Sequence, residues 1–522
     1  MEFKNFREIE KATSVHRGEL FRLGMALLFI VGIMLYASQR LASGPQGMLL
    51  IIAAMIGGYM AMNIGANDVA NNVGPAVGSH AMTMTGAIII AIIFEAGGAL
   101  IAGGDVVSTI KKGVIDPAMI ADSDTFIWLM MAALLAAAIW LNIATIAGAP
   151  VSTTHSIVGG VLGAGIAAGG WSIANWPTMS KIAASWVISP VMGGLIAAGF
   201  LYLIKRTIVY RTDMVEAAKR VVPYLVAVMA WAFTSYLVLK GLKKLWKFSF
   251  LEASGIGLLV AILVFFAVRS VIAATADKLE NTRASINTLF VVPLIFAAAL
   301  LSFAHGANDV ANAVGPLAAI HDAVLHGGVA TKAAIPMWVM MVGAIGIALG
   351  LALYGPKLIR TVGTEITELD QMRAFCIAMA AAITVIIASQ MGLPVSSTHI
   401  AVGGVFGIGF LREYLEANWE RTLDEIRDHH DGEDSDAVDE FLDRYEAASM
   451  HEKNIMLQAL KARSASANLY KKERKKLRRY YRKELVKRSI LLKIAAAWLI
   501  TVPVAGVMAA LIYFMIRGML VA

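Results

Sequence analysis

Long apolar runs alternate with short polar stretches along most of the chain. Many of these runs reach about 20 residues, the length that a helix needs to cross the hydrocarbon core of a bilayer. The first run, residues 23–42, is longer than the apolar core of a cleavable signal peptide, so we expect it to be retained as a helix. The pattern predicts an all-α polytopic membrane protein with about 11–12 transmembrane helices.

The polar stretches divide the chain into six expected segments. These are a cytoplasmic N-terminal segment (1–22), a first transmembrane repeat with a leading helix (23–204), a basic connector with two spans (205–285), a second transmembrane repeat (286–412), a soluble charged insert (413–488) and a C-terminal transmembrane helix (489–522). The insert is acidic in its first half and strongly basic in its second. This composition suggests a helical element at the cytoplasmic surface, in contact with anionic lipid heads.

Composition and charge agree with a membrane protein. Of the 522 residues, 58% are hydrophobic and 16% are charged, and the formal net charge is +8. A soluble protein carries about 25% charged residues. The basic residues lie mostly in loops, where they orient the spans by the positive-inside rule, so we do not expect a nucleic-acid partner. The single cysteine, Cys376, excludes an internal disulfide and a cysteine-rich metal site.

One polar phrase occurs twice within apolar surroundings. Residues 65–75 read GANDVANNVGP and residues 306–316 read GANDVANAVGP, so that only Asn72 and Ala313 differ. Polar groups at membrane depth are costly unless they bind a ligand or one another. The glycine and proline content is typical of broken or re-entrant helices near the bilayer midplane, where transporters hold substrates and ions.

The side chains of this phrase point to ion binding. An intramembrane aspartate is a natural cation ligand or proton carrier. Asparagine carbonyls suit Na⁺ and asparagine amides suit an oxyanion. The candidate residues are Asn67, Asp68, Asn71, Asn308, Asp309 and Asn312. We expect no metal other than Na⁺ at Asp68 and Asp309.

A second phrase is also duplicated. Residues 148–163 read GAPVSTTHSIVGGVLG and residues 392–407 read GLPVSSTHIAVGGVFG, with 11 of 16 positions identical. The offsets of 241 and 244 residues between the copies of the two phrases are nearly equal, so whole segments were duplicated. About seven apolar segments separate equivalent points, and an odd number of crossings places the copies in opposite orientations.

Hydroxyl side chains after a proline in the second phrase predict helix starts. A helix N-terminus presents free N–H groups and partial positive charge, which favour an anion. The candidate anion ligands are Ser152, Thr153, Thr154, Ser396, Ser397 and Thr398. Neither phrase contains Lys or Arg, so a divalent anion needs co-bound cations or protons. Helix packing alone would explain the glycines but not the paired Asn and Asp.

Other titratable residues lie near these phrases. Glu95 is expected at membrane depth, and the corresponding part of the second copy, around residues 336–341, has no acid. Intramembrane carboxylates are functional by default. His155, His305 and His399 lie beside the phrases and are candidate gates or proton sites.

The duplicated GANDVAN and PVS-[ST]-TH phrases resemble the inorganic phosphate transporter family over residues 48–411. The resemblance implies two inverted repeats, symport of phosphate with Na⁺ or H⁺, and a homodimer. It assigns phosphate to the six hydroxyls with Asn67 and Asn308, and coupling to Asp68, Asp309, Asn71, Asn312 and Glu95. Residues 377–382 are apolar where some members have a glutamate, and the insert follows the second repeat, whereas many members have their large loop between the repeats.

The leading interpretation is a secondary active transporter of a bacterial inner membrane. It imports inorganic phosphate with Na⁺ or H⁺ by alternating access around a midplane site and needs no further cofactor. A sulfate, metal-phosphate or other oxyanion permease on the same fold is the nearest alternative. An anion channel, whose flux would ignore Na⁺ and pH gradients, is the alternative from another class. The sequence shows no Ser-His-Asp arrangement, metal cluster or nucleotide loop at usable spacing, so an enzyme is not expected.

Overall fold

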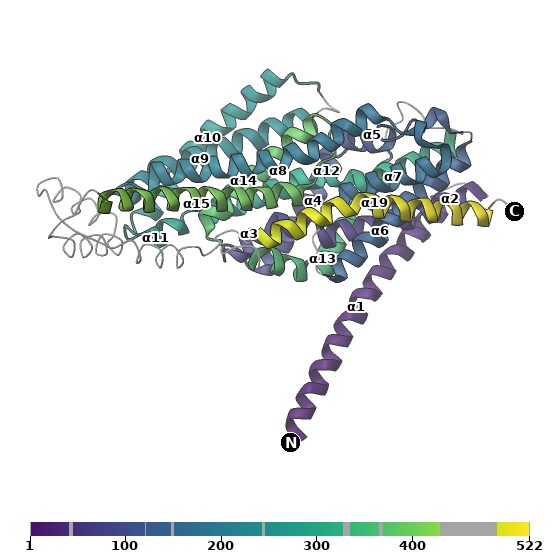
Figure 1. Cartoon of the computed structure of the whole chain (residues 1–522), viewed down its shortest axis with the longest axis horizontal. Helices are drawn as coiled ribbons and strands as arrows, with labels where there is room; N and C mark the ends of the chain where they lie inside the picture. The colour runs from purple at the N-terminus through teal and green to yellow at the C-terminus, as the bar shows by residue number, and fades with distance from the viewer. Residues whose placement is uncertain are drawn as a thin grey trace, which may run out of the picture.

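The structure is a computed structural model of an elongated helical bundle (Figure 1). It describes residues 2–40, 45–120, 122–147, 151–242, 246–326, 335–364, 369–428 and 488–520. In these ranges every named element is a helix. Eleven of the described helices are long and apolar enough to cross a membrane, which agrees with the predicted fold class. Most of the insert and residues 148–150 lie outside the described ranges.

The first helix stands apart from the bundle. Helix α1 (Glu2–Arg40) is continuous across the expected boundary at residue 22. Its main contacts are with helices α2 and α13, and it projects away from the other helices (Figure 1). The first repeat follows as α2 (Pro45–Asn67), α3 (Ala70–Gly78), α4 (Met84–Ala102), α5 (Gly104–Lys112), α6 (Ser123–Ala147), α7 (Thr153–Gly169) and α8 (Trp176–Ile204), with short 3-10 turns at Pro117–Met119 and Trp171–Ile173.

The connector and the second repeat complete the bundle. The connector contains the π-helical turn η3 (Lys205–Val209), α9 (Met214–Tyr236), the π-helical turn η4 (Leu237–Gly241), α10 (Phe250–Ala276) and α11 (Arg283–Thr288). The remaining helices are α12 (Val291–His326), α13 (Met337–Thr364), α14 (Gln371–Gln390), α15 (Ser397–Asp428) and α19 (Arg488–Leu520). Helix α15 therefore continues past the boundary expected at residue 412. Polar N-caps begin several helices, among them Thr83 for α4 and Asp370 for α14.

The two repeats exchange helices. Helix α2 packs on α13 and α12 packs on α4, while α7 packs on α19 and α15 packs on α8. Helix α19 therefore has the same relation to the second repeat as α8 has to the first. These contacts favour a second repeat that includes α19, with the insert as an interruption between α15 and α19.

Glycines allow the closest of these crossings. A Cβ atom on Gly65 would lie 1.9 Å from the Ile347 carbonyl oxygen, and one on Gly306 would lie 2.2 Å from that of Glu95. No side chain fits at such distances. These two glycines therefore allow α2 to pack closely on α13 and α12 on α4.

The duplicated polar phrase has two different backbones. In the first copy α2 ends at Asn67 and α3 begins at Ala70, so the predicted break lies at Asp68. In the second copy α12 passes through the phrase and Pro316 without interruption, so the prediction of a break there is wrong. A membrane helix tolerates a proline because neighbouring groups satisfy the freed carbonyl. The continuous helix also places His305 and Asp309 one turn apart on the same face.

Candidate functional site

Asp68 lies at the buried meeting point of the two repeats. Its Oδ2 accepts a hydrogen bond from the Thr153 hydroxyl at 2.5 Å, and its Oδ1 accepts one from Thr398 at 3.2 Å. Thr153 begins α7 in the first repeat, and Thr398 lies in the first turn of α15 in the second. All three side chains are buried. One carboxylate therefore joins the starts of both helices.

Two asparagines make reciprocal contacts across the repeats. The Asn71 amide donates to the Thr398 hydroxyl at 2.9 Å. The Asn312 amide donates to the hydroxyls of Thr153 at 3.0 Å and Thr154 at 3.2 Å. Each asparagine belongs to one GANDVAN phrase and reaches the helix start of the other repeat. The structure thus brings together the residues that the sequence analysis selected from four distant segments.

Asn67 and Asn308 have a different role in this conformation. The Asn67 side-chain oxygen accepts from the Val151 amide at 3.2 Å, and that of Asn308 accepts from the Val395 amide at 3.4 Å. Their amide nitrogens donate to hydroxyls of the same repeat, Thr145 and Ser389. Both asparagines therefore position the segment that leads into α7 or α15. The sequence analysis had grouped them with the phosphate ligands and had not selected their hydroxyl partners.

The predicted serines divide into caps and a free hydroxyl. Ser152 accepts a hydrogen bond from the His155 amide at 3.1 Å, and Ser396 accepts one from the His399 amide at 3.3 Å. These are N-cap contacts, as expected at a helix start. The Ser397 hydroxyl is buried and has no hydrogen-bond partner among the described residues. Ser397 is thus available to a ligand in this conformation.

A buried histidine links two carboxylates. His305 Nδ1 lies 2.9 Å and 2.8 Å from the two carboxylate oxygens of Glu95, and its Nε2 lies 2.8 Å from Asp309 Oδ2. All three side chains are buried. Nδ1 is hydrogen-bonded to Glu95, whereas Nε2 and Asp309 Oδ2 lie at ion-pair distance without a hydrogen bond between them.

The Glu95–His305–Asp309 link has no counterpart at the equivalent positions of the pseudo-symmetric site. Asn72 donates to Glu95 Oε1 at 2.7 Å, and Ala313 takes the place of Asn72 in the second copy. The offset of 241 residues places Ile64 opposite His305. The helix crossings place Ile347 opposite Glu95, and not the expected region around residues 336–341. The one difference between the two phrases is therefore explained by the Glu95 contact.

The site contains more buried acidic groups than basic ones. Asp68, Glu95 and Asp309 face one imidazole, and uncompensated buried charges are strongly unfavourable. Ligand atoms of Asp68, His305 and Asp309 all lie within 4.8 Å of one another, close enough to share an ion. Four oxygens, both of Asp309 and one each of Asn71 and Asn312, are buried without a hydrogen-bond partner in the described ranges. Such hard oxygen donors suit a small hard cation.

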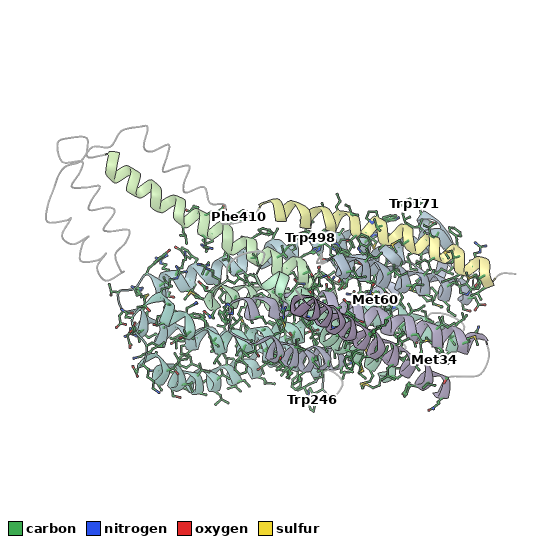
Figure 2. The ribbon with its side chains drawn as sticks, turned by 90° about the horizontal axis from the view of Figure 1, so that it is seen from below. Met34, Met60, Trp171, Trp246, Phe410 and Trp498 are labelled. Atoms are coloured by element: carbon green, nitrogen blue, oxygen red, sulfur yellow. The ribbon has the colours of Figure 1, made fainter. Side chains whose placement is uncertain are left out.

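Four aromatic rings pack in a row across the repeats, and we call them the histidine stack, although the two imidazoles meet edge to face. The His155 and His399 rings lie 4.4 Å apart, and they pack on Trp186 at 3.8 Å and Trp498 at 3.6 Å, respectively. Figure 2 shows Trp498 near the start of α19. No ring nitrogen of either histidine makes a hydrogen bond to a described residue. The sequence analysis missed both tryptophans, although WVISP and WLITVP form a third, weaker repeat.

The comparisons with known proteins decide the family. A model described as the phosphate transporter family matches residues 64–509. This chain belongs to the phosphate transporter family. The match extends across the insert and into α19, which agrees with a second repeat that includes this helix.

Similar proteins cover 72–98% of the chain. A protein of Helicobacter pylori (strain J99 / ATCC 700824) named "Putative phosphate permease" is 55% identical over 524 residues, with 98% of both chains covered. "Putative phosphate permease PF1020" of Pyrococcus furiosus is 41% identical over 72% of this chain and 91% of its own. A solved structure described as "The sodium-dependent phosphate transporter" has a TM-score of 0.74 and 31% identity, covering 91% of this chain and all of that one.

These findings establish the class of the protein. It is a phosphate permease, an integral membrane transporter with many transmembrane helices, and not an enzyme. The duplicated phrases correctly identified this family from the sequence.

Proposed function

We propose that this transporter imports inorganic phosphate by symport with Na⁺ or H⁺, by alternating access around the Asp68 site. The observation that carries the proposal is the charge of this buried site. Three carboxylates and one imidazole meet there, and neither GANDVAN phrase nor PVS phrase supplies a Lys or Arg. A phosphate dianion added to this site needs co-bound cations or protons, because buried like charges repel strongly. Uptake is therefore coupled.

The proposed phosphate site lies at the starts of α7 and α15. Both helix starts carry hydroxyls, and both N-termini are buried. Free N–H groups and the helix dipole stabilise an anion there. Ser397, Thr153, Thr154 and Thr398 are the proposed direct ligands, whereas Ser152, Ser396, Asn67 and Asn308 would hold the two helix starts in place. A protonated phosphate could also donate to Asp68 or Asp309, which bare sulfate cannot do.

The proposed coupling site comprises Asp68, Asp309, Asn71 and Asn312. Its unpartnered oxygens suit Na⁺, and the name of the structural relative mentions sodium dependence. Proton coupling is the alternative, because the Glu95–His305–Asp309 chain can hold and pass a proton. The two ions differ in a measurable way, since only one of the two imposed gradients would drive uptake.

Alternating access is supported by the exchanged helices of the repeats. Inverted repeats that rock about a midplane site are common in secondary transporters. With α7 counted as a crossing, six spans (α4, α6, α7, α8, α9 and α10) separate the helices that carry the two GANDVAN phrases, so α12 would run opposite to α2. We extend the proposal to a homodimer in a bacterial inner membrane; the bacterial relatives support the membrane, and the homodimer is what the family resemblance implies.

The test is uptake of radiolabelled phosphate into liposomes that contain the purified protein. Na⁺ and pH gradients are imposed separately, with excess sulfate as competitor. We expect uptake that follows one gradient, resists sulfate and disappears in Asp68→Asn and Asp309→Asn. The exposed Asp277→Asn serves as the matched control and should transport normally. Competition by sulfate would reassign the substrate. Flux that ignores both gradients and survives both site substitutions would overturn symport in favour of a channel.

A further inference from the structure

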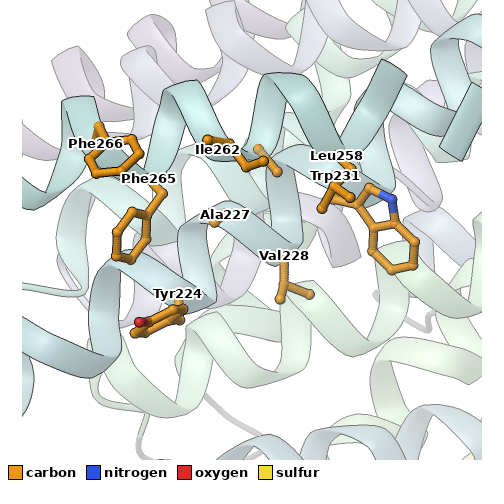
Figure 3. A pocket seen from close by; sticks show the side chains of 9 residues that line it. Tyr224, Ala227, Val228, Trp231, Leu258, Ile262, Phe265 and Phe266 are labelled. Carbon is orange, nitrogen blue, oxygen red and sulfur yellow. The ribbon is translucent and has the colours of Figure 1, made fainter. Parts of the chain in front are cut away.

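An apolar groove runs between the two connector helices. It has a volume of about 420 Å³ and is lined by nine apolar or aromatic residues of α9 and α10. Tyr224, Phe265 and Phe266 lie toward one end and Trp231 toward the other (Figure 3). From Tyr224 to Trp231 the groove is about 10 Å long, at 1.5 Å of rise per helical residue. Both helices are candidate membrane spans, so the groove opens at bilayer depth.

The indole N–H of Trp231 in the groove already has hydrogen-bond partners within the protein. The Trp231 indole N–H donates to the Ser254 carbonyl and hydroxyl at 3.1 Å and 3.2 Å. Tyr224 packs its ring 4.7 Å from that of Phe265. The surfaces left to an occupant are therefore aliphatic and aromatic, which fits a hydrocarbon chain.

Two arginines mark one end of the groove. Arg269 follows Phe266 by three residues on α10, and Arg220 precedes Tyr224 by four residues on α9, so each continues its helix face. The helices are antiparallel, as the ion pair between Lys219 and Asp277 shows. Both guanidinium groups therefore lie at the same end. Arg220 pairs with Glu216 at 3.1 Å.

Arg269 is unusual for its depth in the membrane. It lies seven residues before the end of α10 at Ala276, or about 10 Å along the helix. Its side chain is exposed, and none of the ion pairs formed by described residues includes it. A charged side chain at this depth needs a polar partner or must extend to the interface. The same end also carries the basic residues of the loop before α9, which favours an anionic surface.

We propose that the α9–α10 groove binds an anionic phospholipid. One acyl chain occupies the groove against Trp231, and the lipid phosphate pairs with Arg269, with Arg220 beside it. The charge at one end and the hydrocarbon lining at the other match the two halves of such a lipid. A phospholipid supplies the hydrocarbon chain and the anion together, and a second copy of the chain is the alternative occupant that the test distinguishes.

Quenching of Trp231 fluorescence by brominated lipid tests this site. The full-length protein is placed in phosphatidylcholine nanodiscs that contain a small fraction of either brominated phosphatidylglycerol or brominated phosphatidylcholine. The Trp231 signal is the difference between the protein and Trp231→Phe. We expect about fivefold stronger quenching by the anionic lipid at equal fraction, the enrichment that one arginine gives near a membrane surface.

Matched variants separate the head-group and chain contributions. Arg269→Gln should reduce the anionic quenching to the phosphatidylcholine level, whereas Arg211→Gln, an exposed loop arginine, should not. Ala227→Phe should fill the groove and reduce quenching by both lipids. Gel filtration and phosphate uptake verify that each variant is folded. Equal quenching by the two lipids would contradict the site, and protection of Trp231 from both would indicate a second copy of the chain as the occupant.

Discussion

The amide of Asn71 donates a hydrogen bond to the hydroxyl of Thr398, 2.9 Å away and in the other repeat. In the opposite direction, Asn312 of the second repeat donates a hydrogen bond to Thr153 of the first repeat at 3.0 Å. Each GANDVAN phrase is therefore hydrogen-bonded to the PVS phrase of the other repeat. Any movement of one repeat against the other must change these contacts, which lie where the ligands are proposed to bind.

The Asn71–Thr398 hydrogen bond should be measurable as a coupling energy. We expect Asn71→Ala and Thr398→Val each to lower stability and the double variant to be less destabilised than the sum, by about 1 kcal/mol. Thermal unfolding in detergent gives the double-mutant cycle. A cycle of Asn71→Ala with Thr145→Val, whose hydroxyl contacts Asn67 instead, provides the control. Strict additivity of the first pair would mean that the cross-repeat bond adds no stability.

Removal of His305 should destabilise the protein strongly. His305→Phe leaves Glu95 and Asp309 as adjacent buried carboxylates without their shared partner. Loss of one member of a buried ion pair costs about 3–5 kcal/mol. The triple variant Glu95→Gln, His305→Phe, Asp309→Asn should recover part of this stability, because the uncompensated charges are gone. The thermal unfolding midpoints of the single and triple variants show whether stability is recovered. A single variant as stable as the parent would show that the link is not an ion pair.

Gly306 should not tolerate even a methyl group. A Cβ atom there would lie 2.2 Å from the Glu95 carbonyl oxygen, so α12 and α4 must separate in Gly306→Ala. We expect little folded protein on gel filtration and no uptake. Gly104→Ala, where nothing lies within 4 Å of the new atom, should behave as the parent. Normal folding of Gly306→Ala would mean that the helices cross less closely than described.

The sequence was sufficient for the repeats and most of the polar site, for a physical reason. Polar side chains are costly at membrane depth, so their presence in apolar segments was enough to select them as site candidates. These residues are Asp68, Asn71, Asn312, Thr153 and Thr398. The exchange of α8 and α19 between the repeats was missed, although WVISP and WLITVP relate the two helices, because the long insert separates α19 from the rest of its repeat. The continuity of α12 was also missed, since glycine and proline predict a break equally in both phrases.

The roles of Asn67 and His155 depended on three-dimensional contacts. Asn67 has the composition of a ligand, but its oxygen accepts from the Val151 amide. His155 was a candidate gate or proton site, yet its ring lies between Trp186 and His399. The sequence alone does not show whether a histidine packs through its ring or binds a ligand or proton through its nitrogens.

The histidine stack gives a prediction that distinguishes these two uses. The ring nitrogens of His155 and His399 have no hydrogen-bond partner among the described residues, so an apolar ring of similar size should pack at least as well. We expect His155→Phe to keep the unfolding midpoint and the KM for phosphate. His155→Ala should open a cavity between Trp186 and His399, lower stability by about 3 kcal/mol and raise the KM, because the starts of α7 and α15 lose their spacing. Uptake and thermal unfolding are measured on both variants and on the equivalent pair at His399. If His155→Phe abolishes uptake while it remains folded, the imidazole nitrogens bind a transported ion and the stack is part of the transport site.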